Sequence, residues 1–229
     1  ANESLDCAQA LQELTEMGVE TIITFDAHDS RVQNAIPIHG FDNFYTSYQF
    51  IREIFDRNPD MPVDDKHLMI VSPDEGGMGR AVYYASLLGV NMGTFYRRKD
   101  YSTTNDIGEH PVVAVEFLGG DITGKDVIIV DDMIDTGKSM INTALELKKR
   151  GAGKIIMVAT FGLFTNGLEK FDEAYEKGLI YRILTTNLIY QTDELLSREY
   201  SITVDMSKYI ALLIDTLNHD STISHLLNP

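Results

Sequence analysis

The residues best suited to chemistry lie within VIIVDDMIDTGKSM, positions 127–140. Four apolar residues end in two adjacent acids, Asp131 and Asp132, and a turn then leads into a helix-like pattern. The turn consists of Asp135, Thr136, Gly137, Lys138 and Ser139. Backbone N–H groups at a glycine-containing turn and at a helix N-terminus form an anion site. With two hydroxyl donors added, this turn is predicted to hold a phosphate.

The two adjacent acids need a different partner, because two carboxylates at one strand end repel each other. They are suited to accept hydrogen bonds from a vicinal diol or to hold a divalent cation. Phosphate at the turn and a diol at the acids together describe a ribose 5-phosphate moiety. The Gly137-Lys138-Ser139 run is not a P-loop, since that motif needs a glycine where Asp132 stands. A capped helix after a strand would explain the turn but not the acid pair.

Two other apolar runs also end in residues with chemistry. HLMIVS (67–72) is followed by PDEGG, which places Asp74 at the strand end. Gly76 and Gly77 allow the backbone to approach a ligand closely. VETIITF (19–25) is followed by a charged cluster of Asp26, His28, Asp29 and Arg31. For the PDEGG segment, the structural alternative is a tight turn that needs glycines. For the charged cluster, the structural alternative is that ordinary hydrogen bonds hold His28.

Hydrophobic periodicity predicts an α/β fold with a mostly parallel twisted sheet flanked by helices. Seven segments have the pattern of buried strands: 19–25, 67–72, 111–118, 126–132, 154–161, 181–186 and 201–205. Six segments have the pattern of helices: 3–17, 44–57, 78–88, 139–150, 166–177 and 206–217. Ligands of such sheets bind at the carboxyl ends of strands. The polar segment 97–110 is predicted to be a long mobile loop, with a tolerated surface insertion as the alternative.

Composition excludes several classes of protein. The 229 residues, 44% of them hydrophobic, fit one large globular domain or two small ones. The net charge of −16 repels a phosphate backbone, so no nucleic-acid partner is expected. The single Cys7 excludes an intramolecular disulfide and fits a reducing cytoplasm. No apolar run reaches the roughly 18 residues that span a bilayer, and the polar start does not resemble a signal peptide.

The three segments together resemble the ribose-phosphate pyrophosphokinases, or phosphoribosyl pyrophosphate synthetases, which share the type I phosphoribosyltransferase fold. VIIVDDMIDTGKSM resembles the phosphoribosyl pyrophosphate signature of that superfamily. VSPDEGGMGRA and TFDAHDSRVQNAIPIHGFDNFY narrow the resemblance to the synthetases. It runs from about residue 18 to the C-terminus and includes ATFGLFTNGLEKF (159–171), TTN (185–187) and DSTISHLL (220–227).

The resemblance implies an enzyme that converts ribose 5-phosphate and MgATP into phosphoribosyl pyrophosphate and AMP. It assigns ribose 5-phosphate to the acid pair and the turn: Asp131, Asp132, Asp135, Thr136, Gly137, Lys138 and Ser139. It assigns Mg²⁺ to His28 and Asp74. It further implies a cytoplasmic homo-oligomer built from dimers, a hexamer in the family, with no nucleic-acid or membrane partner.

The predicted catalytic loop departs from the family pattern. In the family, a mobile loop brings a Lys and an Arg over the transferring phosphates. Here Arg97 stands at the position of that Lys, and Lys99 stands at the position of that Arg. The charges are retained but exchanged, and the two side chains are not equivalent donors. A slip of one residue, or use of Arg98, stays open as an alternative, and the loop is several residues longer than usual.

The start of the chain departs from the family pattern more strongly. The family has an additional domain-sized stretch before the resemblance begins, which supplies most of the adenine-nucleotide contacts. Here about 17 residues precede the start of the resemblance, so the sequence predicts the C-terminal part of a synthetase. Residues 1–43 are then the end of a truncated domain, and 44–215 the phosphoribosyltransferase-like domain that binds ribose phosphate. Residues 216–229 would pack on the N-terminal remnant.

Two other functions stay open. A phosphoribosyltransferase, which makes a nucleotide from phosphoribosyl pyrophosphate, would share 127–140 but would not need His28 or the PDEGG turn. It should also carry a base-specificity hood, which the sequence does not identify. A catalytically silent subunit that assembles with active synthetases would fit the exchanged charges at Arg97 and Lys99 and the absent ATP-binding half.

Overall fold

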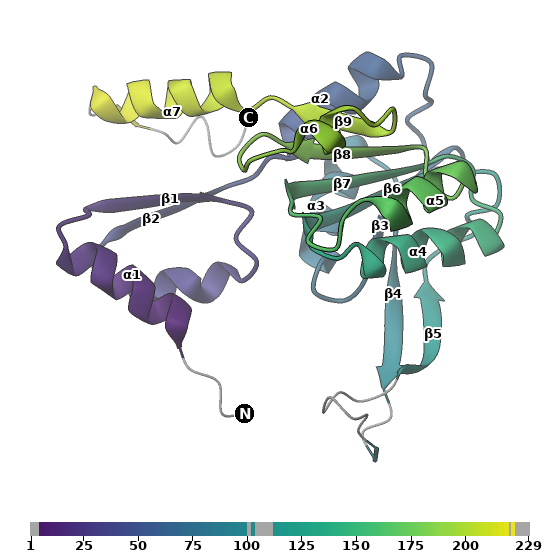
Figure 1. Ribbon diagram of the computed structural model, residues 1–229, viewed down its shortest axis with the longest axis horizontal. Helices are drawn as coiled ribbons and strands as arrows, with labels where there is room; N and C mark the ends of the chain where they lie inside the picture. The colour runs from purple at the N-terminus through teal and green to yellow at the C-terminus, as the bar shows by residue number, and fades with distance from the viewer. Residues whose placement is uncertain (1–4, 100–101, 104–111, 220, 223–229) are drawn as a thin grey trace. The chain divides into compact units, whose positions relative to one another are not determined.

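The computed structural model describes residues 5–99, 102–103, 112–219 and 221–222 (Figure 1). The chain divides into two compact units, one of residues 1–48 with 208–229 and one of residues 49–207. The domain boundaries predicted from the sequence lie at 43/44 and 215/216. Within the described residues, no helix is both long and apolar enough to cross a bilayer.

The larger unit is built on a seven-stranded sheet with the order β5-β4-β3-β6-β7-β8-β9. Its strands are β3 (Leu68–Ser72), β4 (Met92–Lys99), β5 (Val112–Leu118), β6 (Asp126–Ile134), β7 (Ile155–Gly162), β8 (Arg182–Thr186) and β9 (Ser201–Val204). Every neighbouring pair is parallel except β4 and β5, which are antiparallel. The predicted α/β class with a mostly parallel sheet is therefore confirmed.

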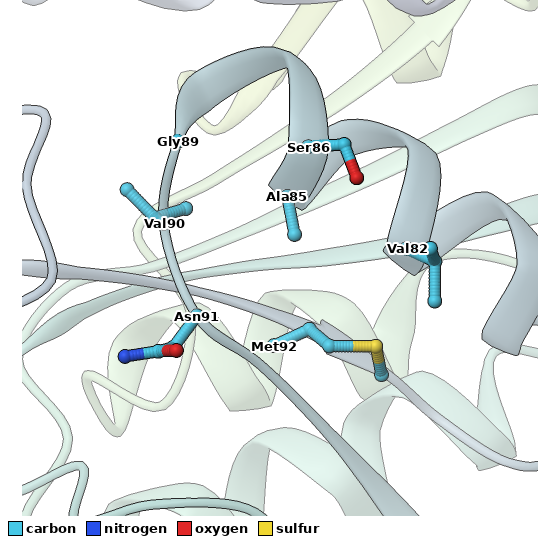
Figure 2. Close-up of a pocket in the computed structure, with 7 residues that line it drawn as sticks. All are labelled: Val82, Ala85, Ser86, Gly89, Val90, Asn91 and Met92. Atoms are coloured by element: carbon cyan, nitrogen blue, oxygen red, sulfur yellow. The ribbon is translucent and has the colours of Figure 1, made fainter.

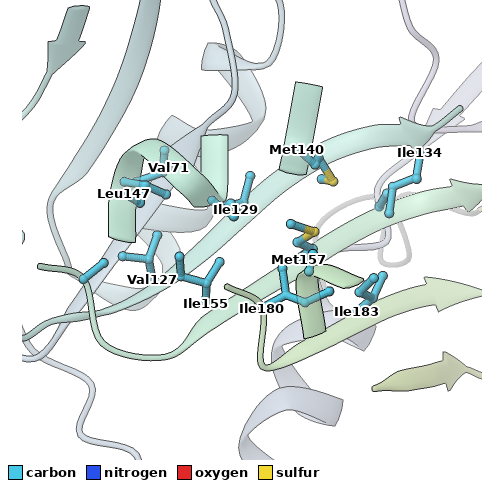
Figure 3. Packing of buried hydrophobic residues seen from close by; sticks show 14 of the residues in the cluster. Val71, Val127, Ile129, Ile134, Met140, Leu147, Ile155, Met157, Ile180 and Ile183 are labelled. Atoms are coloured by element: carbon cyan, nitrogen blue, oxygen red, sulfur yellow. The ribbon is translucent and has the colours of Figure 1, made fainter. Parts of the chain in front are cut away.

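Helices cover both faces of this sheet (Figure 1). They are α2 (Ser47–Arg57, mostly in this unit), α3 (Met78–Leu88), α4 (Lys138–Lys149), α5 (Glu169–Glu176) and the short α6 (Asp193–Leu196). Figure 3 shows Met140 and Leu147 of α4 packed over Ile129 and Met157 of the central strands. These side chains are fully or almost fully buried. The apolar runs that predicted buried strands therefore form the core that fixes β6, α4 and the connection between them.

The smaller unit holds α1 (Asp6–Glu16), β1 (Thr21–Phe25), the 3₁₀ helix η1 (Ser30–Ala35), β2 (Gly40–Phe44) and most of α7 (Ser207–Asn218). β1 and β2 form a two-stranded parallel sheet. Phe44, which is fully buried, and Leu213 of α7 form its apolar centre. The rings of Phe25 and Tyr209 lie 5.9 and 6.1 Å from the ring of Phe44.

All seven predicted strands and all six predicted helices are present, with their ends shifted by a few residues. Two strands were missed. β2 reads GFDNF, and its central polar pair breaks the apolar run that predicts a buried strand. β4 reads MGTFYRRK and ends in three charged residues.

The predicted loop 97–110 is wrong at its start. Arg97, Arg98 and Lys99 belong to β4, where they pair with Val115, Ala114 and Val112 of β5. Pairing with β5 satisfies the backbone of these charged residues, and one face of an antiparallel edge hairpin tolerates charge because it meets solvent. Residues 100–101 and 104–110 of that loop lie outside the described residues, as do residues 220 and 223–227 of the DSTISHLL segment.

An ion-pair cluster attaches α5 to the segment that precedes β9. Arg198 donates from Nε and a terminal nitrogen to the two carboxylate oxygens of Asp172, each at 2.9 Å. The Tyr200 hydroxyl donates to Asp172 Oδ1 at 2.7 Å. The hydrogen bonds from Arg198, followed by that from Tyr200, hold the pKa of Asp172 below its usual value of 3.8. The ionised Asp172 therefore stabilises the folded state.

We expect Asp172→Asn to lower the urea midpoint of unfolding between about pH 5 and 8. The folded pKa lies below the unfolded pKa, so this stabilisation is complete above the unfolded value. It disappears as the pH falls through the folded value. The difference between the two midpoints should therefore shrink below about pH 4.

Glu173→Gln is the matched control for that comparison. The neighbouring carboxylate of Glu173 pairs with Lys177 at 2.9 Å, but both side chains are about two-thirds exposed. An exposed pair of this kind contributes little. Equal effects of the two substitutions would contradict the assigned role of Asp172.

Candidate functional site

Three polar segments of the larger unit meet at the carboxyl ends of neighbouring strands. The order β3-β6-β7 places the PDEGG turn after β3, the acid pair at the end of β6, and the loop after β7 side by side. The strands are parallel, so these segments lie at the same edge of the sheet. The structure thus brings together Asp74, Asp131, Asp132 and the predicted phosphate turn.

The turn after β6 has the geometry of an anion site. Gly137 has a φ of +71° and stands at the N-cap of α4. The first N–H groups of a helix have no partner within the helix. The helix dipole adds a positive field at this end. Thr136 and Ser139 carry hydroxyls beside these amides, and the Lys138 amide donates to the Thr136 hydroxyl at 3.4 Å. The turn can therefore hold a phosphate with backbone and hydroxyl donors together.

Two independent features make Gly137 irreplaceable. Its φ lies in the left-handed region that other residues adopt at a cost. A Cβ at this position would also lie 2.0 Å from Cζ of the fully buried Phe171. Phe171 belongs to α5, so the shape of the turn depends on the packing of a distant helix.

The acid pair is largely withdrawn from water. Asp132 is 4% exposed, and the side chain of Asp131 is 19% exposed. The Asp132 amide donates to Asp131 Oδ1 at 3.0 Å. Burial, followed by the hydrogen bond and the charge of Asp132, raises the pKa of Asp131 to about 7. Near neutral pH the pair readily holds an additional proton, so it favours a ligand that donates hydrogen bonds or carries positive charge.

Sequence reasoning missed Arg80, the cation beside the acid pair. Arg80 stands in α3, and a terminal nitrogen of its guanidinium lies 3.8 Å from Asp131 Oδ1. Its side chain is 15% exposed, and its charge opposes the rise in the pKa of Asp131. The segment VSPDEGGMGRA contains this arginine. Two adjacent acids at the end of one strand need a nearby cation to offset their charge. A search for that cation in the segment after the neighbouring strand would have identified Arg80.

Hydroxyls of two strands fix the PDEGG turn. Ser72 Oγ and Thr94 Oγ1 both donate to the Asp74 carbonyl oxygen, at 2.6 and 3.2 Å. The Gly76 amide donates to Asp74 Oδ1 at 3.0 Å. A Cβ at Gly77 would lie 2.5 Å from Ser72 Oγ, so the glycine permits a close approach of the turn to the strand end. Asp74 is therefore held in place at the site.

The third predicted cluster belongs to the smaller unit. Asp29 caps η1, and its carboxylate accepts hydrogen bonds from Arg31, which lower the pKa of Asp29 to about 2. The buried Asp26 has a φ of +43° and accepts a hydrogen bond from the Thr46 hydroxyl at 2.5 Å. Hydrogen bonds within the unit thus engage Asp26, Asp29 and Arg31.

The predicted Mg²⁺ ligands lie in different units, His28 in the smaller and Asp74 in the larger. In the described part of the chain, no group of three or more His, Cys, Asp or Glu side chains could hold a metal ion. Mg²⁺ commonly binds through one or two carboxylates together with water and substrate phosphates. The chemistry of Asp74, a carboxylate at the strand ends, fits that mode, and its role stays a prediction.

A basic side chain of β4 reaches the phosphate turn. A terminal nitrogen of Arg97 donates to Ser139 Oγ at 3.0 Å. Arg98, the next residue, is exposed. Lys99 is the last residue of β4, and its side chain lies outside the described atoms. The structure thus connects Arg97 to the site.

A pocket of about 350 Å³ lies away from these residues (Figure 2). Its lining residues are Val82, Ala85, Ser86, Gly89, Val90, Asn91 and Met92. They belong to the end of α3 and the start of β4. The pocket therefore lies on the side of the amino ends of the strands, opposite the carboxyl ends that carry the acid pair and the turn. It has no titratable lining residue, and we therefore place the chemistry at the acid pair and the turn.

Known proteins resemble this chain over the part that contains these residues. Residues 45–192 match the phosphoribosyl transferase domain family, and this range contains the acid pair, the turn and the PDEGG segment. The chain belongs to the phosphoribosyltransferase domain family. A solved structure of phosphoribosylpyrophosphate synthetase from Mycobacterium smegmatis has the same fold, with a TM-score of 0.77 at 20% identity. It matches over 96% of this chain and 66% of that chain.

Curated relatives named ribose-phosphate pyrophosphokinase are similar to most of this chain. The ribose-phosphate pyrophosphokinase of Vibrio parahaemolyticus serotype O3:K6 is 27% identical over 94% of this chain. Enzymes of the same name from Wolinella succinogenes and Mycoplasmopsis pulmonis are 33% and 31% identical over 77% and 91% of it. The chain covers 63%, 51% and 61% of these three relatives, respectively.

Proposed function

We propose that this chain carries the ribose 5-phosphate half of a ribose-phosphate pyrophosphokinase. The observation that carries the proposal is the buried acid pair at the end of β6, followed by the left-handed Gly137 at the start of α4. The phosphate of the sugar would bind the amides and hydroxyls of the turn. Its ribose hydroxyls would donate to Asp131 and Asp132.

In the whole protein, the anomeric hydroxyl of the bound sugar would attack the β-phosphorus of ATP. The C1 oxygen forms a bond to this phosphorus, the bond to the bridging oxygen of the α-phosphate breaks, and AMP leaves. The hydroxyl proton passes to solvent or to a base. Such transfers depend on alignment and charge neutralisation rather than on covalent chemistry of the protein.

The proposed cations have separate tasks. Arg97 binds the phosphate group of the sugar beside the turn, and Lys99 approaches the transferring phosphates of ATP. Asp74 would contribute a carboxylate to Mg²⁺, which would supply positive charge to the phosphate oxygens. The same proposal includes MgATP as the second substrate and a homo-oligomer built from dimers. A synthetase of this kind would act in the cytoplasm.

An assay of AMP release and nucleotide formation tests this function on the 229-residue chain. We expect binding of ribose 5-phosphate without release of AMP, because most of the ATP site belongs to the family stretch that precedes this region. Release of AMP that depends on ribose 5-phosphate would contradict the assignment of the chain as a half. Formation of a nucleotide from phosphoribosyl pyrophosphate and a free base would replace the synthetase with a phosphoribosyltransferase.

Arg97 and Lys99 of β4 should differ when each is replaced with alanine. Lys99→Ala is expected to leave ribose 5-phosphate affinity within about twofold and to lower turnover of the full-length enzyme about 100-fold, the usual loss of one transition-state donor. Arg97→Ala should also weaken sugar-phosphate binding, because its guanidinium contacts the turn through Ser139. Calorimetry gives the affinity, and AMP release gives the turnover. Equal losses of both quantities in Lys99→Ala would show that Lys99 binds the ground state.

A further inference from the structure

We propose that the segment Leu163–Thr165 after β7 is a positioning device for the phosphate turn. It acts together with Phe171 of α5 and holds Asp135 and Gly137 in their anion-binding arrangement before any ligand arrives. The inference rests on the proposed function only for the identity of the ligand.

Backbone and side-chain hydrogen bonds join this segment to the turn. The amides of Leu163 and Phe164 both donate to the Ile134 carbonyl oxygen, at 2.8 and 3.1 Å. The Thr165 amide donates to the Asp135 carbonyl oxygen at 3.1 Å, and the Thr165 hydroxyl donates to Asp135 Oδ1 at 2.5 Å. The regular pairing of β6 with β7 ends at Ile134 and Gly162. These four bonds therefore extend the connection from the strands into the turn.

A pair of aromatic rings supports the same turn. The rings of Phe164 and Phe171 meet edge to face, with their centroids 5.1 Å apart. Phe171 is fully buried and occupies the space that a Cβ on Gly137 would need. A Cβ at Gly162 would lie 2.7 Å from Cε2 of Phe164, so this glycine makes room for the ring. Phe164 thus fixes the ring that lies against the turn.

The backbone of Phe164 is strained. Its φ is +48°, a left-handed value that a bulky side chain adopts only when its surroundings enforce it. Here the enforcing contacts are the hydrogen bond from the Phe164 amide to the Ile134 carbonyl oxygen and the edge-to-face contact with Phe171. Ile134 directly precedes the phosphate turn, and Phe171 lies against Gly137 within it. Backbone strain of this kind is concentrated at functional sites, where a particular backbone conformation is needed. A turn fixed in advance binds its ligand without a further ordering cost.

Two substitutions test the device without disturbing residues of the proposed binding site. Thr165→Val removes the hydroxyl bond to Asp135, and Thr165 is exposed, so the core stays intact. Phe164→Gly removes the ring but accepts the left-handed backbone without strain. Thr203→Val is the matched control, since it removes a comparable hydroxyl bond, 2.8 Å to Gln191 Oε1, on β9, two strands from β7.

Hydrogen exchange and calorimetry give the readouts. In the ligand-free chain, both substitutions should speed amide exchange in peptides covering 135–141 by about tenfold, while Thr203→Val should not. Ribose 5-phosphate should bind about tenfold more weakly to both variants, and Thr165→Ser should restore the parent affinity. The thermal midpoint of Thr165→Val should stay near that of the parent, which separates positioning from general loss of structure.

The outcomes separate this inference from the proposed function. Exchange and affinity unchanged in both variants would overturn the positioning role. If exchange increases as expected but the parent chain does not bind ribose 5-phosphate, the positioning role stands and the proposed function fails.

Discussion

Gly137→Ala is expected to abolish ribose 5-phosphate binding and to lower the free energy of unfolding by about 2–5 kcal/mol. The new methyl group would overlap the ring of Phe171, its carbon lying 2.0 Å from Cζ. The ring is fully buried and cannot move without displacing α5. The φ of +71° adds the cost of a left-handed alanine. Urea unfolding and calorimetry measure the two losses.

Gly89→Ala separates these two causes. Gly89, which caps α3 beside the pocket of Figure 2, has a φ of +66°, but a Cβ there meets no atom within 4 Å. It should cost only the left-handed backbone, about 1–2 kcal/mol, and leave sugar-phosphate binding intact. Equal losses of stability in the two variants would contradict the overlap with Phe171.

Asp131→Asn is expected to have opposite effects on binding and on stability. Loss of a charged acceptor for the sugar hydroxyls should weaken ribose 5-phosphate binding by about 1.5–3 kcal/mol. The same change should stabilise the chain by about 1–2 kcal/mol at pH 8, because the folded protein no longer holds a buried charge beside Asp132. Calorimetry and urea unfolding of the two proteins test both effects.

The pH dependence of that stabilisation has a definite sign. The pKa of Asp131 is raised from 3.8 to about 7, chiefly by burial. As pH rises from about 4 to 7, the unfolded chain loses this proton first, so the parent protein becomes less stable. The difference between the variant and the parent should therefore grow over this range and level off above pH 7. A difference that is constant from pH 4 to 8 would contradict the assignment.

Local sequence patterns were sufficient to predict the strands and helices that carry the site. The apolar run before Asp131 and the helix pattern after Ser139 each follow from a few neighbouring residues, so β6 and α4 could be located. The end of β4 could not be located in this way. Its charged residues are stabilised by pairing with β5, and hydrophobic periodicity does not encode that contact.

Residues that act across strands were the ones missed. Arg80 reaches Asp131 only because β3 and β6 are neighbours in the sheet. Phe171 of α5 lies against Gly137 in the turn after β6, although 34 positions separate the two residues in the chain. Tertiary contacts of this kind are invisible to a search by motif, whereas the residues of one turn are not.

Isothermal titration of the 229-residue chain with ribose 5-phosphate tests the central claim most directly. Inorganic phosphate and ribose serve as the two partial ligands. If the acid pair and the turn form one site, ribose 5-phosphate should bind with one site per chain and more tightly than either partial ligand. Absence of binding at millimolar ribose 5-phosphate, or an affinity no greater than that of inorganic phosphate, would contradict a sugar-phosphate site at the end of β6.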